Sequence, residues 1–206
     1  MALVIVTVSS QYGSGGLGAG RIVAQRLGYK FVDQQLPTVV AKRLGISREA
    51  VSAAESASAS VAERVLRVLE LGTPEVDASQ GGPSFDEECA REVQQAVRDY
   101  AARGNCVIVG HGGSAILGRR PDVIRVYVYA PRDWRIHQIM SGHDVDEKTA
   151  SDEVDRIDRR RGEYMRHYYE MEWGNPAHYD LALDTSTFGP DGAAALVVRA
   201  VELRGE

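Results

Sequence analysis

A strand, a glycine-rich turn and a helix follow one another at the start of the chain. Residues 3–8 are a run of apolar and β-branched residues, typical of a central strand buried on both faces of a parallel sheet. The turn Gly13-Ser14-Gly15-Gly16 comes next, and a predicted helix then ends at Gly28. This order aims several backbone N–H groups and the positive end of the helix dipole at one point. We therefore expect the turn to bind the phosphates of a nucleotide.

The glycines of this turn replace the charged residues that a phosphate-binding loop usually contains. Glycine allows positive φ values and close approach of the backbone to an anion. Against the pattern G-x-x-x-x-G-K-[ST], Gly16 stands in place of the lysine and Leu17 in place of the Ser or Thr. Arg21, about one helical turn further on, is the nearest replacement cation. Residues 13–18 also satisfy G-x-G-x-x-G, with Asp33 downstream, so a dinucleotide-binding fold stays open.

The rest of the chain alternates between the two kinds of secondary structure. Further strands are predicted at 29–32, 106–109, 124–129 and 181–183, and helices at 39–44, 47–71, 84–104, 132–140, 148–171 and 192–203. A loop is expected at 72–84, and Ser84 with Glu87 forms a capping-box pattern. The alternation predicts an α/β fold with a parallel sheet. We expect one domain over residues 1–206, with a helical insertion at 34–104.

Composition narrows the classes of partner. The net charge of -5 argues against a general nucleic-acid binder, although arginines crowd between Arg156 and Arg166. The first residues resemble neither a signal peptide nor a membrane span, so we expect no membrane partner and a cytoplasmic location. Cys89 and Cys106 have no second Cys or His at ligand spacing and are expected to be buried thiols in a reducing compartment. No metal site is predicted from protein side chains alone.

Six separated segments occur in an order typical of one family. They are Val8-Ser-Ser-Gln-Tyr-Gly-Ser-Gly-Gly16, Phe31-Val-Asp33, Val107-Ile-Val-Gly-His-Gly112, Val128-Tyr-Ala-Pro131 with Arg135, Asp158-Arg-Arg-Arg-Gly-Glu-Tyr164, and Tyr179-Asp-Leu-Ala-Leu-Asp-Thr185. Together they resemble the cytidylate-kinase-like family of P-loop proteins. The resemblance implies the nucleoside monophosphate kinase fold, with a five-stranded parallel sheet, a substrate-binding helical insertion and an arginine-bearing lid at 140–172. It also implies transfer of the γ-phosphoryl group of ATP, with Mg²⁺, to CMP or dCMP.

The resemblance also implies roles for individual residues. Gly13, Ser14, Gly15 and Gly16 match the loop that cradles the donor phosphates, with Arg21 as the replacement cation. Asp33 is expected to act as the base or to orient the metal, and Arg135 matches an arginine on the helix that enters the lid. The lid arginines Arg159, Arg160 and Arg161 are expected to close over the transferring group, and Arg156 and His111 to contact the substrate. In such catalysis, positioning and charge neutralisation dominate.

Two departures from the family pattern keep other functions open. His111 stands where the family usually has an arginine that holds the acceptor phosphate, and Leu17 stands where it often has another. A histidine is charged only near or below a pKa of about 6.5 and cannot make the bidentate contact of a guanidinium. A kinase with a different hydroxyl or phosphate acceptor and a non-catalytic nucleotide-binding module therefore remain alternatives.

Simpler structural roles fit the same residues. The arginine run also fits a solvated helix face that pairs with acidic residues of its own helix, Asp152, Glu153, Asp155 and Asp158. Asp33 also fits a helix N-cap, and His111 a cap or a turn residue. Aromatic side chains at helical spacing usually pack in a core. We expect that packing role for Tyr164, Tyr168, Tyr169 and Trp173.

Overall fold

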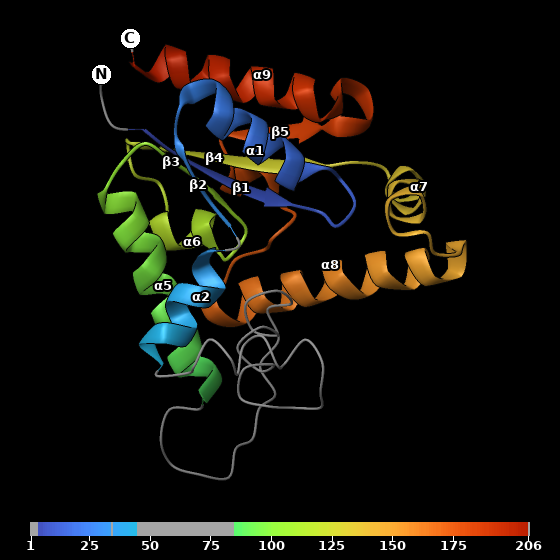
Figure 1. Cartoon of the computed structure of the whole chain (residues 1–206), viewed down its shortest axis with the longest axis horizontal. Helices are drawn as coiled ribbons and strands as arrows, with labels where there is room; N and C mark the ends of the chain where they lie inside the picture. Colours follow the sequence, from blue (N-terminus) through green and yellow to red (C-terminus); the bar gives the residue numbers. More distant parts are fainter. Residues whose placement is uncertain (1–3, 34, 45–84, 206) are drawn as a thin grey trace.

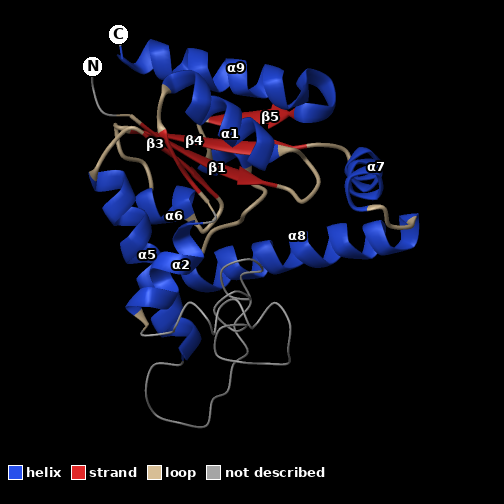
Figure 2. Ribbon diagram, in the orientation of Figure 1, coloured by secondary structure: helices blue, strands red, loops and turns tan. Residues whose placement is uncertain are grey.

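Five parallel strands form a single sheet in the computed structural model, which describes residues 4–33, 35–44 and 85–205 (Figure 2). The strands are β1 (Ile5–Ser10), β2 (Lys30–Val32), β3 (Cys106–Val109), β4 (Val123–Tyr129) and β5 (Leu181–Asp184). Their order is β2-β3-β1-β4-β5, and every neighbouring pair is parallel. The predicted α/β class, the five-stranded parallel sheet and the central position of the first strand are confirmed.

Helices cover both faces of this sheet (Figure 1). Helices α1 (Gly16–Leu27) and α9 (Thr185–Gly205) lie on one face, and α2 (Gln35–Arg43), α5 (Phe85–Ala102), α6 (Gly113–Leu117) and α8 (Glu147–Tyr169) lie on the other. Helix α7 (Arg132–His143) lies beyond the carboxyl ends of the strands and packs on α8. A short 3₁₀ helix spans Pro176–His178. Within the described ranges, no helix is both long and apolar enough to cross a membrane.

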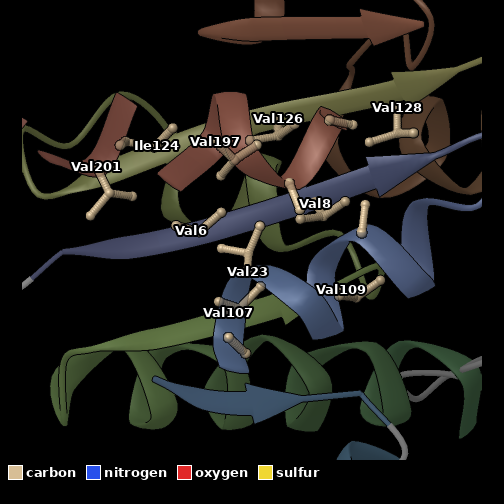
Figure 3. Close-up of a cluster of buried hydrophobic side chains, with 14 of the residues drawn as sticks. Val6, Val8, Val23, Val107, Val109, Ile124, Val126, Val128, Val197 and Val201 are labelled. Carbon is tan, nitrogen blue, oxygen red and sulfur yellow. The ribbon is translucent and has the colours of Figure 1, made fainter. Parts of the chain in front are cut away.

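The first strand is buried on both faces, as its unbroken apolar run predicts. Val6 and Val8 face α1 and α9, where they pack with Val23 and Val197 (Figure 3). Ile5 points to the other face, into a second cluster formed mainly with α2 and α5. The fully buried side chains of β1 hold the strand, and therefore the turn that follows it, at the centre of the molecule.

Several helices differ from the sequence prediction. Helix α1 begins at Gly16, inside the predicted turn. Helix α9 begins at Thr185 and not at residue 192, because two helical segments meet at Gly189, whose φ of 63° and ψ of 170° interrupt the helix before Pro190. Helix α6 was not predicted, since its five residues are too few to show a helical period. The predicted helix 47–71, the loop 72–84 and the capping residue Ser84 lie outside the described residues.

The predicted packing roles of the cysteines and the aromatic residues are confirmed. Cys89 and Cys106 are both buried and free, and burial raises the pKa of the Cys106 thiol to about 11. Tyr164 is buried in a cluster with Tyr127 and Tyr179. Tyr168, Tyr169 and Trp173 pack against that cluster, which joins α8 to the sheet.

Candidate active site

The carboxyl ends of all five strands meet at one edge of the sheet, where ligands of open α/β folds bind. The glycine loop follows β1 at this edge, and Asp33 follows β2. His111 comes two residues after the end of β3, and Thr185 directly follows β5. The fold therefore gathers residues that lie up to about 170 positions apart in the sequence.

The glycine loop takes backbone conformations that other residues rarely adopt. Gly13 has a φ of 77° and Gly15 a φ of 76°, both in the left-handed region. A Cβ on Gly13 would lie 2.9 Å from the carbonyl oxygen of Arg135. Gly15 is the N-cap of α1 and offers no side chain to cap it. The first amide groups of α1 have no acceptor within the helix and are oriented to bind an anion.

Ser14 holds the loop from the inside. Its buried hydroxyl donates to the carbonyl oxygen of Gln11 at 2.7 Å. Its own carbonyl accepts a hydrogen bond of 2.6 Å from the hydroxyl of buried Thr185. The Ser14 amide donates to the same Gln11 carbonyl at 3.2 Å, so the hydroxyl, amide and carbonyl of Ser14 all bond within the protein and fix the loop.

Arg135 and Asp158 fix the backbone of Tyr12, at the start of the loop. Arg135, with 7% of its side chain exposed, donates to the carboxylate of Asp158 at 2.6 Å and to the carbonyl of Tyr12 at 2.9 Å. Asp158 accepts in turn from the Tyr12 amide at 2.8 Å. The structure therefore shows that the guanidinium of Arg135, predicted to be catalytic, ties α7, α8 and the loop together.

Arg161 brings a second guanidinium to the same segment. It donates to the carbonyl oxygen of Ser10 at 2.7 Å, and its Cζ atom lies 6.0 Å from the centre of the Tyr12 ring. Burial lowers the pKa of Arg161, whereas the carboxylate of Asp158 raises it. A guanidinium starts from a pKa so high that it keeps its charge. Among the predicted lid arginines, Arg161 is the one that the structure brings into contact with the loop.

The other predicted arginines of α8 do not contact the loop. Arg159 is exposed, and Arg156 and Arg160 are half-buried. In the part of the chain that the structure describes, none of these three side chains forms an ion pair. Their roles stay predictions.

The acidic residues of α8 pair mainly with partners other than the arginine run. Asp155 pairs with Arg132 of α7 at 2.7 Å, and Asp152 pairs with Lys148 at 3.2 Å. The ion pairs of these acids are therefore made with Arg132, Lys148 and Arg135, although Asp155 still interacts electrostatically with Arg159, and Asp158 with Arg161. The alternative in which the arginine run pairs with acids of its own helix stays open.

The contact that the structure shows for Arg21 is with an aromatic ring of β2. Its Cζ atom is 5.5 Å from the centre of the Phe31 ring on β2. In the sheet, β3 separates β2 from the strand that carries the loop. No contact between Arg21 and residues 13–16 is present in the described ranges, so its predicted cofactor contact is not supported by the geometry.

His111 is buried next to Asp33. Its Nε2 atom lies 3.9 Å from Oδ1 of Asp33, and 9% of the His111 side chain is exposed. Burial lowers the pKa of His111 to about 4, so the imidazole is neutral at pH 7. The structure thus brings the predicted base and the predicted substrate contact together, and His111 offers a substrate no positive charge.

The residues around the loop could bind Mg²⁺ only together with the phosphates of a bound nucleotide. Among the described residues, no group of three His, Cys, Asp or Glu side chains is close enough to hold a metal ion. Mg²⁺ commonly keeps several waters and takes one or two carboxylates plus substrate phosphates. Asp33 is the predicted carboxylate, while Leu17 presents an apolar side chain, 42% exposed, in place of the usual hydroxyl.

Sequence reasoning missed the residues that hold the site in shape. Tyr12, Asp158 and Thr185 make the bonds described above, and Pro190 lies 3.1 Å from the place of a Cβ on Gly15. Tyr12, Asp158 and Thr185 stand within the six quoted segments. The bonds from Tyr12 to Asp158 and from Thr185 to Ser14 each join residues more than 100 positions apart, so no local pattern assigns these roles.

Sequence comparisons identify relatives of this chain. A sequence model of the cytidylate kinase-like family matches residues 5–187. Cytidylate kinase of Natronomonas pharaonis is 25% identical over 199 residues, which cover 96% of this chain and 89% of the relative. Cytidylate kinase of Ignicoccus hospitalis is 24% identical over 197 residues, which cover 96% of this chain and 98% of the relative.

Solved structures share the architecture. A protein of Eubacterium ventriosum superposes with a TM-score of 0.71 at 20% identity, over 97% of this chain and 98% of the other. Shikimate kinase of Bacteroides thetaiotaomicron superposes with a TM-score of 0.54 at 13% sequence identity, over 98% of this chain and 99% of the other. These structures establish the P-loop kinase fold. The sequence match extends over most of the chain, and the chain therefore belongs to the cytidylate kinase-like family.

Proposed function

We propose that the protein transfers the γ-phosphoryl group of ATP to a nucleoside monophosphate, with CMP or dCMP as the first acceptor to test. The observation that carries the proposal is the glycine loop at the sheet edge, with Arg161 of α8 bonded to the strand end that leads into it. Amides and a guanidinium around one space suit the charge of a triphosphate. Named relatives are cytidylate kinases, which supports the choice of acceptor.

In the proposed reaction, an oxygen of the acceptor phosphate forms a bond to the γ-phosphorus. The bond from that phosphorus to the β–γ bridging oxygen breaks, and ADP leaves. Mg²⁺ bound to the phosphates would neutralise part of their charge. The main-chain amides of the loop and Arg161 would orient the donor, while the lid arginines Arg156, Arg159 and Arg160 would supply further charge to the acceptor and the transferring group.

A second candidate is transfer to a hydroxyl acceptor. The observation that favours it is the neutral, buried imidazole of His111, which gives an acceptor phosphate no cation at the end of β3. A hydroxyl must lose a proton during transfer, and the carboxylate of Asp33 is the proposed base. A nucleoside monophosphate is already ionised at pH 7 and needs no such base, so full activity of Asp33→Asn with a nucleoside monophosphate would count against the hydroxyl acceptor.

A non-catalytic nucleotide-binding module is the third candidate, because Gly16 and Leu17 remove the loop ammonium group and hydroxyl. Such a module would bind ATP equally well with and without Mg²⁺ and would form no product. The two buried free cysteines support a reducing, cytoplasmic setting for each of these candidates.

Product analysis distinguishes the three. Purified protein is incubated with ATP, Mg²⁺ and one acceptor at a time, including CMP, dCMP, other nucleoside monophosphates and hydroxylated metabolites, and nucleotides are separated by chromatography. The proposal expects CDP or dCDP and ADP in equal amounts. ADP formed only with a hydroxylated acceptor supports the second candidate. ATP binding with no product from any acceptor, at micromolar enzyme, supports the third.

A further inference from the structure

The space in which the side chain of residue 16 would begin is filled by another residue of the loop. A Cβ built on Gly16 would lie 2.7 Å from Oγ of Ser10, with the Cβ of Ser10 closer still, and 3.3 Å from the Cβ of Val128. Contacts this short do not occur for real Cβ atoms, and Val128 is buried in the sheet. Position 16 therefore has room only for glycine while position 10 carries a side chain.

Ser10 differs from the other serines around the loop. The hydroxyl of Ser14 is bonded inward to the Gln11 carbonyl, and that of Ser9 lies 3.1 Å from the Ser114 hydroxyl. Ser10 is half-buried at the end of β1, and its hydroxyl has no hydrogen-bond partner among the described residues. Its carbonyl accepts from Arg161 at 2.7 Å, so the hydroxyl and the guanidinium belong to the same small region.

In the loop pattern G-x-x-x-x-G-K-[ST], position 10 corresponds to the first glycine and position 16 to the lysine. This chain carries the reverse arrangement, with the side chain at 10 and the glycine at 16. We infer that the loop's side-chain contact to the bound phosphate has moved from position 16 to position 10, where the Ser10 hydroxyl donates to the triphosphate beside Arg161. This inference rests on the proposed function, because it names a further residue that binds the same ATP.

The first part of the test measures the steric contact between positions 10 and 16 and needs no nucleotide. Gly16→Ala is expected to lower the melting temperature strongly, because its Cβ meets Ser10, whereas Ser10→Gly with Gly16→Ala is expected to recover most of that loss. Equal losses in the single and the double variant would overturn the steric exchange.

The binding arm titrates ATP with Mg²⁺ into the folded protein by calorimetry. Ser10→Ala is expected to weaken ATP binding about 10-fold, as expected for one hydrogen bond to a charged group. Ser10→Lys, which puts an ammonium group at the inferred position, is expected to tighten it by about the same factor. Ser141→Ala, at an exposed serine of α7, is the matched control and is expected to bind like the wild type.

The outcomes separate this inference from the proposed function. If the wild type binds ATP and Ser10→Ala binds it equally well, the role of Ser10 is overturned and the proposed function stands. If the wild type binds no ATP, the proposed function is overturned and the role of Ser10 with it. Wild-type binding that Ser10→Ala weakens and Ser10→Lys strengthens supports the role of Ser10, and the product analysis then tests the transfer reaction separately.

Discussion

Two glycine-rich turns lie at the same edge of the sheet and differ in what surrounds them. The turn after β1 has left-handed glycines at Gly13 and Gly15, and leads into the 12-residue helix α1. The turn after β3 has three consecutive left-handed residues, Gly110, His111 and Gly112, and leads into α6, which has five residues. Local sequence alone makes the two turns look alike.

Their electrostatic surroundings differ. Arg135 and Arg161 both hydrogen-bond to residues 10–12, which lead into the first turn. The second turn contains a buried, neutral imidazole next to a carboxylate, and burial, helped by the charge of Arg161, lowers the pKa of that imidazole. The comparison teaches that, among the described residues, the cations that bond to this edge come from α7 and α8, which are distant in sequence.

Among the variants that test the difference between the two turns, Arg161→Ala is expected to have the largest effect. Removing the guanidinium should lower kcat/KM for ATP by at least about 100-fold, because a preorganised charge in a half-buried site is lost. Arg161→Lys should retain more activity than the alanine variant, and Arg166→Ala, at an exposed position of the same helix, is the control. Thermal unfolding of each variant separates loss of function from loss of fold. Full activity in Arg161→Ala would break the comparison.

Arg135→Ala tests the same contrast through the stability of the protein. Its partner Asp158, 17% exposed, would lose the cation that hydrogen-bonds to it and keep only the weaker attraction of Arg161, and we expect a loss of about 3 kcal/mol in the free energy of unfolding. The matched control is Arg132→Ala, which breaks an exposed pair between the same two helices and should cost much less, because solvent screens that pair. Urea unfolding measures both, and similar losses would contradict the distinction.

The neutral state of His111 predicts a pH dependence of stability. Its pKa in the folded protein is about 4, below the ordinary 6.5, so the unfolded chain takes up a proton first as the pH falls. Stability from this group is full above pH 6.5 and is lost as the pH falls toward 4, by about 2 kcal/mol between pH 7 and pH 5.

Urea unfolding at pH 7 and pH 5 checks this. His111→Asn, which suits the left-handed backbone, should remove that part of the pH dependence. His137→Asn, at an exposed position of α7, should leave it unchanged. An unchanged pH dependence in His111→Asn would show that the imidazole is not the source.

Gly13→Ala has the smallest expected effect, about 1–2 kcal/mol of destabilisation, because a Cβ meets the Arg135 carbonyl at a positive φ. Gly142→Ala is its control: nothing lies within 4 Å of the added Cβ, and alanine favours the helix α7, so stability should stay equal or rise slightly. The measurement is the urea concentration at the midpoint of unfolding for each variant and for the wild type. A Gly13→Ala variant as stable as the wild type would show that the first turn tolerates a side chain.

The sequence predicts the framework better than the site. The apolar run of β1 and the helical periodicity of α8 are local patterns, so their type was predicted correctly and their ends within a few residues. The partners of Tyr12 and Ser10 come from α8, about 150 positions away, and no local pattern reports such a contact. The pKa of His111 depends in the same way on burial by elements remote in the chain. Arg21 was chosen for its nearness in sequence, whereas helix geometry directs it to Phe31.

The two peptide groups that flank Tyr12 are both held, one through its N–H to Asp158 and the other through its C=O to Arg135. A residue fixed on both sides cannot change its φ and ψ without breaking a bond to a buried ion pair. The loop is therefore preorganised during folding, and little of its conformational entropy is left to be lost when a ligand arrives. Rigidity of this kind leaves no slow ordering step to be made at each encounter with a ligand.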